Sequence, residues 1–254
     1  MKKAIIEASF GTSRINAFEN SVLALKETFE AAFSDYEIFT ALTSPKVLSA
    51  LKKQGLNFDT ADEALSRLKE NGFTEVIIQP THFIAGFEYE MLLDSTEKYK
   101  NDFQLIKVGA PLLDSKDDMG KVCRIIAEKF PNETVVLMGH GTEHSANKAY
   151  TSFRSVCIEL GFDNIYTTTV EAEPTIDDVI AELKLCGKEK VTLMPLMFVA
   201  GDHAENDMAG NSPDSMKSHL EAAGIEVKCV LKGLGEYPEI RSLYCEHINN
   251  VLKG

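Results

Sequence analysis

Residues 79–92 read QPTHFIAGFEYEML, and residues 194–207 read MPLMFVAGDHAEND. Aligned at an offset of 115 residues, the two stretches share Pro80 with Pro195, Phe83 with Phe198, Ala85 with Ala200, and Gly86 with Gly201. Two further pairs match in the same chain order: SFGTS from Ser9 with MGHGTEHS from Met138, and LTSPKVLSALK from Leu42 with EAEPTIDDVIAELK from Glu171. Three matches in one order indicate that the chain contains two copies of one structural unit.

Short apolar runs of strand length alternate along the chain with segments of helical periodicity. The runs are KAIIEA from Lys3, EIFTAL from Glu37, EVIIQP from Glu75, QLIKVG from Gln104, TVVLMG from Thr134, IYTTTV from Ile165, KVTLMP from Lys190 and EVKCVL from Glu226. Between them, apolar residues recur three and four positions apart, as in the segments 16–32, 61–69 and 177–185. This alternation is typical of parallel sheets that are covered by helices on both faces.

Eight such strands could close into one barrel, which typically needs about 250 residues. The internal repeat favours a different α/β fold, with two similar Rossmann-like domains that each contain a four-stranded parallel sheet flanked by helices. We place these domains at residues 1–130 and 131–254. Ligands of open parallel sheets bind outside the carboxyl ends of the strands. The repeated stretches all follow strands, so we expect them to line an interdomain cleft.

The composition limits the partners of this 254-residue chain, whose formal net charge is −13. An acidic balance argues against nucleic acid and against an anionic membrane, because both require local positive charge. No run approaches the ~18 apolar residues of a membrane-spanning helix, and the first apolar run stops at Glu7, too early for a secretory leader. We therefore expect a cytoplasmic protein, and the sequence leaves a homo-oligomer open. The five cysteines form no CxxC pair, which predicts unpaired thiols.

The repeat also reveals where the two halves differ in chemistry. The differing positions pair Phe10 with His140, Leu42 with Glu171, and Glu88 with His203. Only the second half thus carries two imidazoles and a carboxylate after successive strands. This set suits a divalent metal such as cobalt, iron, nickel or zinc, and three protein ligands leave positions open for exchange. We predict that His140, Glu171 and His203 bind one metal ion.

Neighbouring residues bear on this prediction. Gly139 and Gly141 flank the first histidine and permit a close backbone approach that a buried structural histidine would not need. Glu173 lies two residues after Glu171 and points the same way on an extended chain, so it is either a reserve ligand or a solvated neighbour. His82 precedes the Ala-Gly pair of the first half and is a candidate for substrate contact.

The motifs that follow the strands resemble a known family. GHGT after the fifth apolar run, VEAEP after the sixth and LMPLMFVAGDHAENDMAG after the seventh are similar to the class II tetrapyrrole chelatases. The resemblance is closest to the sirohydrochlorin cobaltochelatases of anaerobic cobalamin biosynthesis. It spans nearly the whole chain, includes QPTHFIAGFEYE, and is most specific in GDHAENDM. It implies two Rossmann-like domains with the macrocycle in the cleft between them.

The resemblance also implies a reaction. A lyase of this family inserts cobalt(II) into sirohydrochlorin and releases two protons, without ATP, an organic cofactor or partner subunits, so that cobalt is a substrate. The metal-binding histidine of the family, which is also its proposed proton acceptor, falls on His140. The family's glutamate falls on Glu171, and its second histidine falls on His203. Glu173 is a departure, because the family often has another residue there.

Residues of the first half are candidates for handling the macrocycle. Glu88 is a candidate catalytic group that receives protons or helps to distort the ring; alternatively, it is a first-turn helix residue favoured by the helix dipole. Phe10 could pack against the macrocycle plane. Gly11 and Thr12 could bind substrate carboxylates together with adjacent backbone N–H groups. Arg14 supplies positive charge for an acidic substrate, which the protein's net charge makes scarce.

Two other functions compatible with the sequence are an iron chelatase and a storage protein. An iron chelatase that acts on sirohydrochlorin or a porphyrin would use the same ligands, because these metals all accept nitrogen and oxygen donors. A haem- or metal-binding storage protein has a similar two-lobed fold. It has no need for a free proton acceptor beside the metal.

Overall fold

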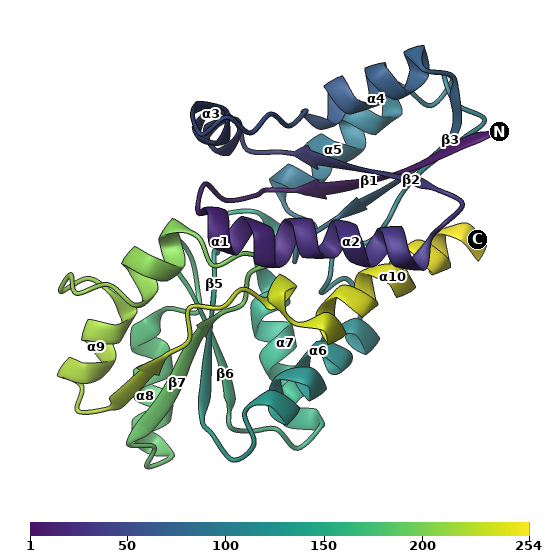
Figure 1. The fold of residues 1–254 in the computed structure, drawn as a ribbon. Coiled ribbons are helices and arrows are strands. Elements are labelled where there is room, and N and C mark those ends of the chain that lie inside the picture. Colours follow the sequence, from purple (N-terminus) through teal and green to yellow (C-terminus); the bar gives the residue numbers. More distant parts are fainter. Residues whose placement is uncertain (254) are drawn as a thin grey trace. The chain divides into compact units, whose positions relative to one another are not determined.

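The computed structural model describes residues 1–253 and contains two four-stranded parallel sheets (Figure 1). The first sheet has the order β2-β1-β3-β4, with β1 (Lys2–Ser9), β2 (Glu37–Leu42), β3 (Phe73–Pro80) and β4 (Leu105–Val108). The second has the order β6-β5-β7-β8, with β5 (Val135–Gly139), β6 (Ile165–Thr169), β7 (Lys190–Pro195) and β8 (Glu226–Cys229). The predicted α/β fold with two similar sheets is confirmed, and the order of the strands is the same in both.

The helices connect the strands as the alternating pattern predicts. Those up to residue 112 are α1 (Ile15–Phe18), the π-helix η1 (Glu19–Leu23), α2 (Ala24–Ala32), α3 (Pro45–Lys53), α4 (Ala61–Glu70) and α5 (Phe87–Glu97). The later ones are α6 (Lys116–Lys129), the 3₁₀ turn η2 (Ser145–Asn147), α7 (Lys148–Glu159), α8 (Ile176–Leu185), the π-helix η3 (Ala204–Met208), α9 (Met216–Ala222), the 3₁₀ turn η4 (Leu234–Glu236) and α10 (Pro238–Lys253). Capping boxes at Thr60 and Thr175 fix the starts of α4 and α8.

The chain divides into two compact units, but not at residue 130 as the sequence predicts. The first unit comprises Met1–Leu112 and the C-terminal segment from Gly235, and the second comprises Leu113–Leu234. Helix α6 therefore belongs to the second unit, where it packs against α7, and α10 belongs to the first, where it packs against α2 and β3. The boundary differs because the repeated motifs locate only the ends of strands. The apolar stripe of a helix does not indicate which of the two sheets the helix covers.

Hydrogen bonds between neighbouring strand ends repeat in the two sheets. In the first sheet, the N–H of Thr43 donates to Ser9 O (2.8 Å) and that of Thr81 to Ala8 O (2.9 Å). In the second sheet, the N–H of Val170 donates to Gly139 O (3.1 Å) and that of Leu196 to Met138 O (2.7 Å). The equivalent central strands β1 and β5 thus hold the segments that follow their neighbours in the same way, which supports the duplication seen in the sequence.

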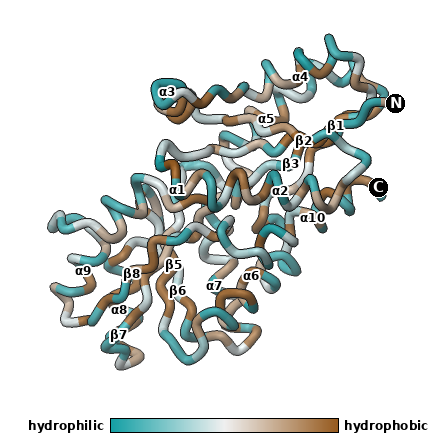
Figure 2. Tube along the Cα trace, in the orientation of Figure 1, coloured by the Kyte–Doolittle hydropathy of each residue, from teal (hydrophilic) through white to brown (hydrophobic). Residues whose placement is uncertain are grey.

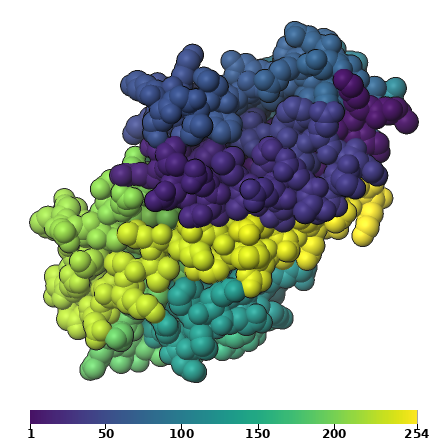
Figure 3. Space-filling view, in the orientation of Figure 1, coloured from purple at the N-terminus to yellow at the C-terminus, as the bar shows by residue number. Residues whose placement is uncertain are grey.

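Each sheet packs helices against apolar strands, which are largely white to brown in the hydropathy view (Figure 2). In the first unit, α4 contributes Ala64, Leu65 and Leu68 to a buried cluster with β1 and β3. Helices α2 and α10 pack against each other in the same unit, and the space-filling view shows their atoms in direct contact (Figure 3). In the second unit, α8, α9 and η3 share a buried cluster with β5, β6 and β7.

A buried acid lies within the first sheet. Glu7 on β1 is fully buried, and Thr40 on β2 donates a hydrogen bond of 3.2 Å to its carboxyl group. Burial raises the pKa of the Glu7 carboxyl well above its ordinary value, although Thr40 and the charge of Lys26 oppose the shift. Burial therefore favours the protonated form of Glu7 more strongly in the folded protein than in the unfolded chain.

The cysteines differ in part from the prediction. Cys123 on α6 and Cys157 on α7 form a disulfide, with Cα atoms 5.9 Å apart. The prediction of unpaired thiols is wrong for this pair, because the contact between α6 and α7 brings together residues whose separation of 34 positions carries no motif. Cys186, Cys229 and Cys245 are free thiols. No helix within residues 1–253 combines the length and the apolar character needed to span a membrane.

Candidate functional site

Two glycines at the end of β5 position His140. A Cβ atom on Gly139 would lie 2.2 Å from the ring of Tyr150, so only glycine lets the strand pass this close to α7. Gly141 has a φ of +83°, and a Cβ there would lie 2.8 Å from the backbone nitrogen of Ala172. Both glycines therefore have the role that the sequence predicts, and they hold His140 at the carboxyl end of the strand.

The backbone connects His140 directly to the segment that follows β6. The N–H of Glu171 donates to His140 O across 2.9 Å. Asn147 also connects these two segments. Its Oδ1 accepts a hydrogen bond from Thr142 N (3.1 Å), and its Nδ2 donates one to Glu173 O (2.6 Å). Sequence reasoning missed Asn147, whose only signal is an amide that follows the GHGT motif.

The side chains of the three predicted ligands lie together in the second unit. The ring centroids of His140 and His203 are 4.6 Å apart, and their planes make an angle of 81°. Glu171 Oε2 lies 3.6 Å from His140 Nδ1. These side chains are 40–56% exposed, so they are accessible to a metal ion and to substrate. The structure thus brings together Glu171 of the VEAEP motif and both histidines.

The hydrogen bonds of the two imidazoles determine which ring nitrogen is available. His140 Nδ1 lies 3.0 Å from Gly141 O, and His203 Nδ1 lies 2.6 Å from Asp207 Oδ2. A carbonyl oxygen only accepts hydrogen bonds, so the proton of His140 is on Nδ1. Nε2 of that ring therefore carries the lone pair that can bind a metal or accept a proton.

The three side chains do not form a closed ligand set as they stand. Within residues 1–253, no group of three or more His, Cys, Asp or Glu side chains has the arrangement of a complete metal site. The role of His140, Glu171 and His203 as ligands of one ion therefore stays a prediction.

The predicted substrate residues of the first unit follow β1. Phe10 and Arg14 are exposed, with 46% of Phe10 accessible, whereas Gly11 and Thr12 are buried. Gly11 has a φ of +77°, and Thr12 Oγ1 accepts a hydrogen bond of 3.2 Å from the N–H of Arg14. Gly11 and Thr12 thus shape the turn, whereas the side chains of Phe10 and Arg14 reach the surface.

Glu88 and His82 lie near the carboxyl end of β3. Glu88 is exposed in the first turn of α5. This position agrees both with a catalytic group and with an acidic residue that the helix dipole favours. Burial lowers the pKa of His82 to about 4, and the nearby charge of Glu88 opposes this shift. Neither ring nitrogen of His82 has a hydrogen-bond partner among the described residues. His82 is therefore a neutral imidazole at physiological pH.

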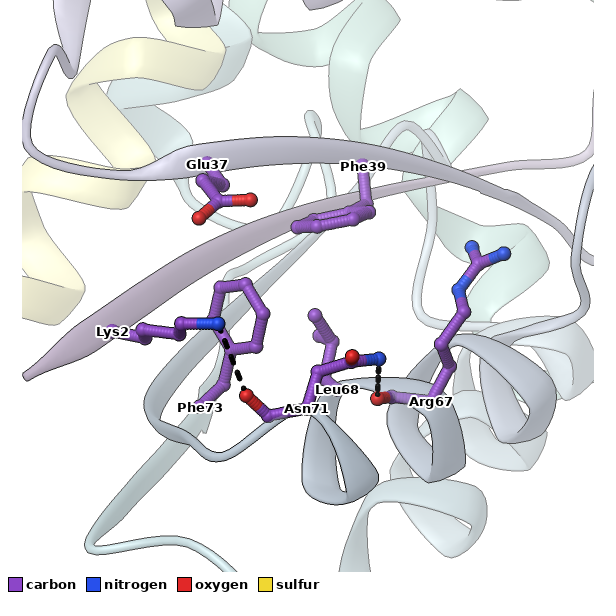
Figure 4. Close-up of a pocket in the computed structure, with 7 residues that line it drawn as sticks. All are labelled: Lys2, Glu37, Phe39, Arg67, Leu68, Asn71 and Phe73. Atoms are coloured by element: carbon purple, nitrogen blue, oxygen red, sulfur yellow. Dashed lines mark hydrogen bonds between the residues drawn. The ribbon is translucent and has the colours of Figure 1, made fainter.

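A pocket of about 190 Å³ lies at the other end of the first sheet, away from the residues that follow its strands (Figure 4). It is lined by Lys2, Glu37, Phe39, Arg67, Leu68, Asn71 and Phe73. Its polar groups are largely engaged: Lys2 Nζ donates to Asn71 O (3.2 Å), and Arg67 forms an ion pair with Asp59. Because β1, β2 and β3 begin here, the pocket is separate from the residues that follow the strands.

Comparison with known proteins assigns the chain to a family. Residues 3–253 match the cobalt chelatase (CbiK) family. A sirohydrochlorin cobaltochelatase of Salmonella typhimurium is 37% identical over 257 residues, which cover 99% of this chain and 97% of the relative. The sirohydrochlorin cobaltochelatase CbiKC of Nitratidesulfovibrio vulgaris is 32% identical, with coverage of 97% and 89%.

Solved structures agree on the fold. SirB from Bacillus subtilis with Fe³⁺ superimposes with a TM-score of 0.65 at 16% identity and covers 98% of this chain and 95% of its own. The sirohydrochlorin chelatase SirB from Bacillus subtilis subspecies spizizenii in complex with cobalt also gives a TM-score of 0.65, at 14% identity, with coverage of 100% and 96%. The match over nearly the whole length and the identity to two cobaltochelatases show that this chain belongs to the cobalt chelatase family.

Proposed function

We propose that this protein inserts cobalt(II) into sirohydrochlorin, with cobalt as a substrate. One observation carries the proposal: in a chain of the cobalt chelatase family, two imidazoles with centroids 4.6 Å apart lie beside a carboxylate after β5, β6 and β7. The donor set of His140, His203 and Glu171 suits cobalt(II), which accepts both nitrogen and oxygen ligands.

The reaction is an exchange of ions on the macrocycle. Two N–H bonds of the tetrapyrrole break, two protons leave, and cobalt(II) forms bonds to the ring nitrogens without a change in oxidation state. No step in this balance requires ATP or an organic cofactor. Independence from both is part of the same proposal and is supported by the family resemblance. We propose a cytoplasmic location as well.

His140 has two roles in this mechanism. Its Nε2 lone pair holds the incoming ion, and once the ion has moved to the macrocycle the same lone pair can accept one of the released protons. Glu171 supplies negative charge beside the ring and compensates the charge of the ion. The exposure of the three side chains permits rotation about their side-chain torsions when an ion binds.

Residues of the first unit complete the proposal on the substrate side. Phe10 offers an exposed aromatic face for an apolar macrocycle. Arg14 offers positive charge for the substrate carboxylates, and Thr12 Oγ1 in the buried turn accepts a hydrogen bond from its backbone N–H. We propose Glu88, exposed at the start of α5, as a second group that receives a proton.

A spectrophotometric assay tests this function. Purified protein is mixed with sirohydrochlorin and either cobalt(II) or iron(II), and metal insertion is followed by absorbance. We expect insertion of cobalt faster than the uncatalysed background, and His140→Ala should reduce the rate at least about 100-fold. His219→Ala, which changes a histidine on α9 that contacts Asp177, is the matched control and should leave the rate nearly unchanged.

Three outcomes contradict the proposal in different ways. Acceleration with iron alone would identify an iron chelatase. Tight binding of the tetrapyrrole without acceleration by either metal would identify a storage protein. Full activity of the His140→Ala variant would remove His140 from the mechanism.

A further inference from the structure

We propose that Asp207 is a positioning residue that fixes the tautomer of His203 and so leaves Nε2 as its metal-binding atom. The proposal rests on the proposed function, in which His203 binds cobalt. Asp207 itself contacts the histidine and acts on the metal only through it.

The local backbone holds the two side chains side by side. Ala204 and Met208 of η3 are fully buried in the core of the second unit. His203 and Asp207 each precede one of these anchors, so they share the adjacent, accessible face of the same turn. The N–H of Ala209 donates to Ala204 O (3.2 Å), five residues back, and this π-type turn keeps the spacing.

The contact between the two side chains fixes the position of the proton. His203 Nδ1 lies 2.6 Å from Asp207 Oδ2, a charge-assisted distance. An ionised carboxylate can only accept, so Nδ1 must carry the hydrogen, and Nε2 keeps its lone pair. A free imidazole side chain in water favours the proton on Nε2, which would block that atom as a ligand.

Both histidines of the site therefore present the same atom. Gly141 O engages Nδ1 of His140, and Asp207 engages Nδ1 of His203. With the ring centroids only 4.6 Å apart, this arrangement makes both Nε2 atoms available to one ion. Carboxylates that orient metal-binding histidines in this way typically change metal affinity 10- to 100-fold.

A purely structural role predicts a different result. The carboxylate of Asp207 is 46% exposed, and exposed ion pairs contribute little to stability. Loss of this carboxylate should thus leave the melting temperature nearly unchanged and weaken the binding of cobalt.

The first experiment reads the tautomer in the metal-free protein. Long-range ¹H–¹⁵N spectra of the imidazoles are recorded at about pH 8, above the ordinary imidazole pKa of about 6.5, and His203→Ala assigns the signal. In the wild-type protein we expect the proton of His203 on Nδ1. In Asp207→Ala it should move largely to Nε2, and Asp207→Asn, whose Oδ1 still accepts, should retain much of the wild-type tautomer. Asp214→Ala removes an exposed carboxylate of the same unit and is the control.

The second experiment titrates the same proteins with cobalt(II) alone. Asp207→Ala should weaken binding about 10- to 100-fold, Asp207→Asn should weaken it less, and Asp214→Ala should not change it. A wild-type His203 protonated on Nε2, or a tautomer unchanged in Asp207→Ala, overturns the role of Asp207 alone. Unchanged cobalt affinity in His203→Ala overturns the proposed ligand set, and with it the action of Asp207 on the metal.

Discussion

The backbone N–H of Glu171 donates to the carbonyl oxygen of His140 across 2.9 Å, so two of the proposed ligands are joined through their main chains. The bond lies where the segments after β5 and β6 meet. It fixes the Cα positions of both residues whatever their side chains do. The side chains can therefore rotate around an ion while their origins stay in register.

The first prediction separates the two carboxylates of the VEAEP motif. Only Glu171 has its carboxylate 3.6 Å from His140, whereas Glu173 contributes its backbone carbonyl to Asn147. We expect Glu171→Gln to lower cobalt affinity more than about 10-fold and to slow insertion. Glu173→Gln should leave both nearly unchanged. Calorimetric titration with cobalt(II) measures the affinities, and equal losses in both variants would make Glu173 a ligand as well.

The second prediction uses two glycines with the same backbone conformation. Gly141 and Gly161 both have a φ of +83°, but a Cβ at Gly161 would meet nothing within 4 Å. Gly161→Ala should thus lower the free energy of unfolding only by the energy of a left-handed conformation at a residue other than glycine, about 1–2 kcal/mol. Gly141→Ala should cost about 1–3 kcal/mol more and lower activity, because its Cβ would press on Ala172 and displace His140. Urea unfolding measures the difference, and equal losses would exclude this contact as a constraint.

The third prediction concerns the pH dependence of stability. In the folded state, burial raises the pKa of Glu7 above its ordinary value of 4.5. As the pH rises above that value, Glu7 ionises in the unfolded chain before it ionises in the folded protein, so it progressively destabilises the fold. Glu7→Gln should therefore raise the melting temperature at neutral pH, and the gain should vanish near pH 4. Glu37→Gln, which changes an exposed carboxylate on β2, is the control, and a gain for Glu7→Gln that did not depend on pH would contradict a raised pKa of Glu7.

The fourth prediction concerns substrate recognition. Arg14 is exposed at the start of α1, after the turn that Gly11 and Thr12 shape. We expect Arg14→Ala to raise KM for sirohydrochlorin about 3- to 10-fold, the range of one ordinary hydrogen bond, with a smaller effect on kcat. Steady-state kinetics measure both, and Arg124→Ala, which removes an exposed arginine of α6, should change neither. An unchanged KM for Arg14→Ala would remove Arg14 from the substrate site.

Much of the fold and the grouping of the candidate site could be predicted from the sequence, because the signals are local. Apolar runs of strand length and the repeated motifs at their ends predict two similar four-stranded parallel sheets, as observed. Comparison of the halves picks out His140, Glu171 and His203, which the structure brings together. Their chemical role is not tested by their position alone.

The features that the sequence did not reveal depend on packing between segments far apart in the chain. The amphipathic pattern of α10 does not predict which of the two sheets the helix covers. Contacts with the first sheet decide this, such as the hydrogen bond that Tyr244 donates to Thr81 O (3.0 Å). The pairing of Cys123 with Cys157 depends likewise on the contact of two helices. Asp207 is different, because its spacing of four residues from His203 can be read from the sequence. That spacing places the two side chains next to each other only if the segment is helical, which the structure shows.

The discontinuity of the first unit has a consequence for biosynthesis. The second unit, Leu113–Leu234, is continuous and can fold as soon as it has left the ribosome. The sheet of the first unit is translated earlier, yet it lacks α10 until residues 238–253 have emerged. At about 5–20 residues per second, the part of β3 and α2 that α10 covers thus stays exposed in the nascent chain for many seconds. The half that is made first is completed last, so the apolar surface that α10 later covers stays accessible to chaperones during translation.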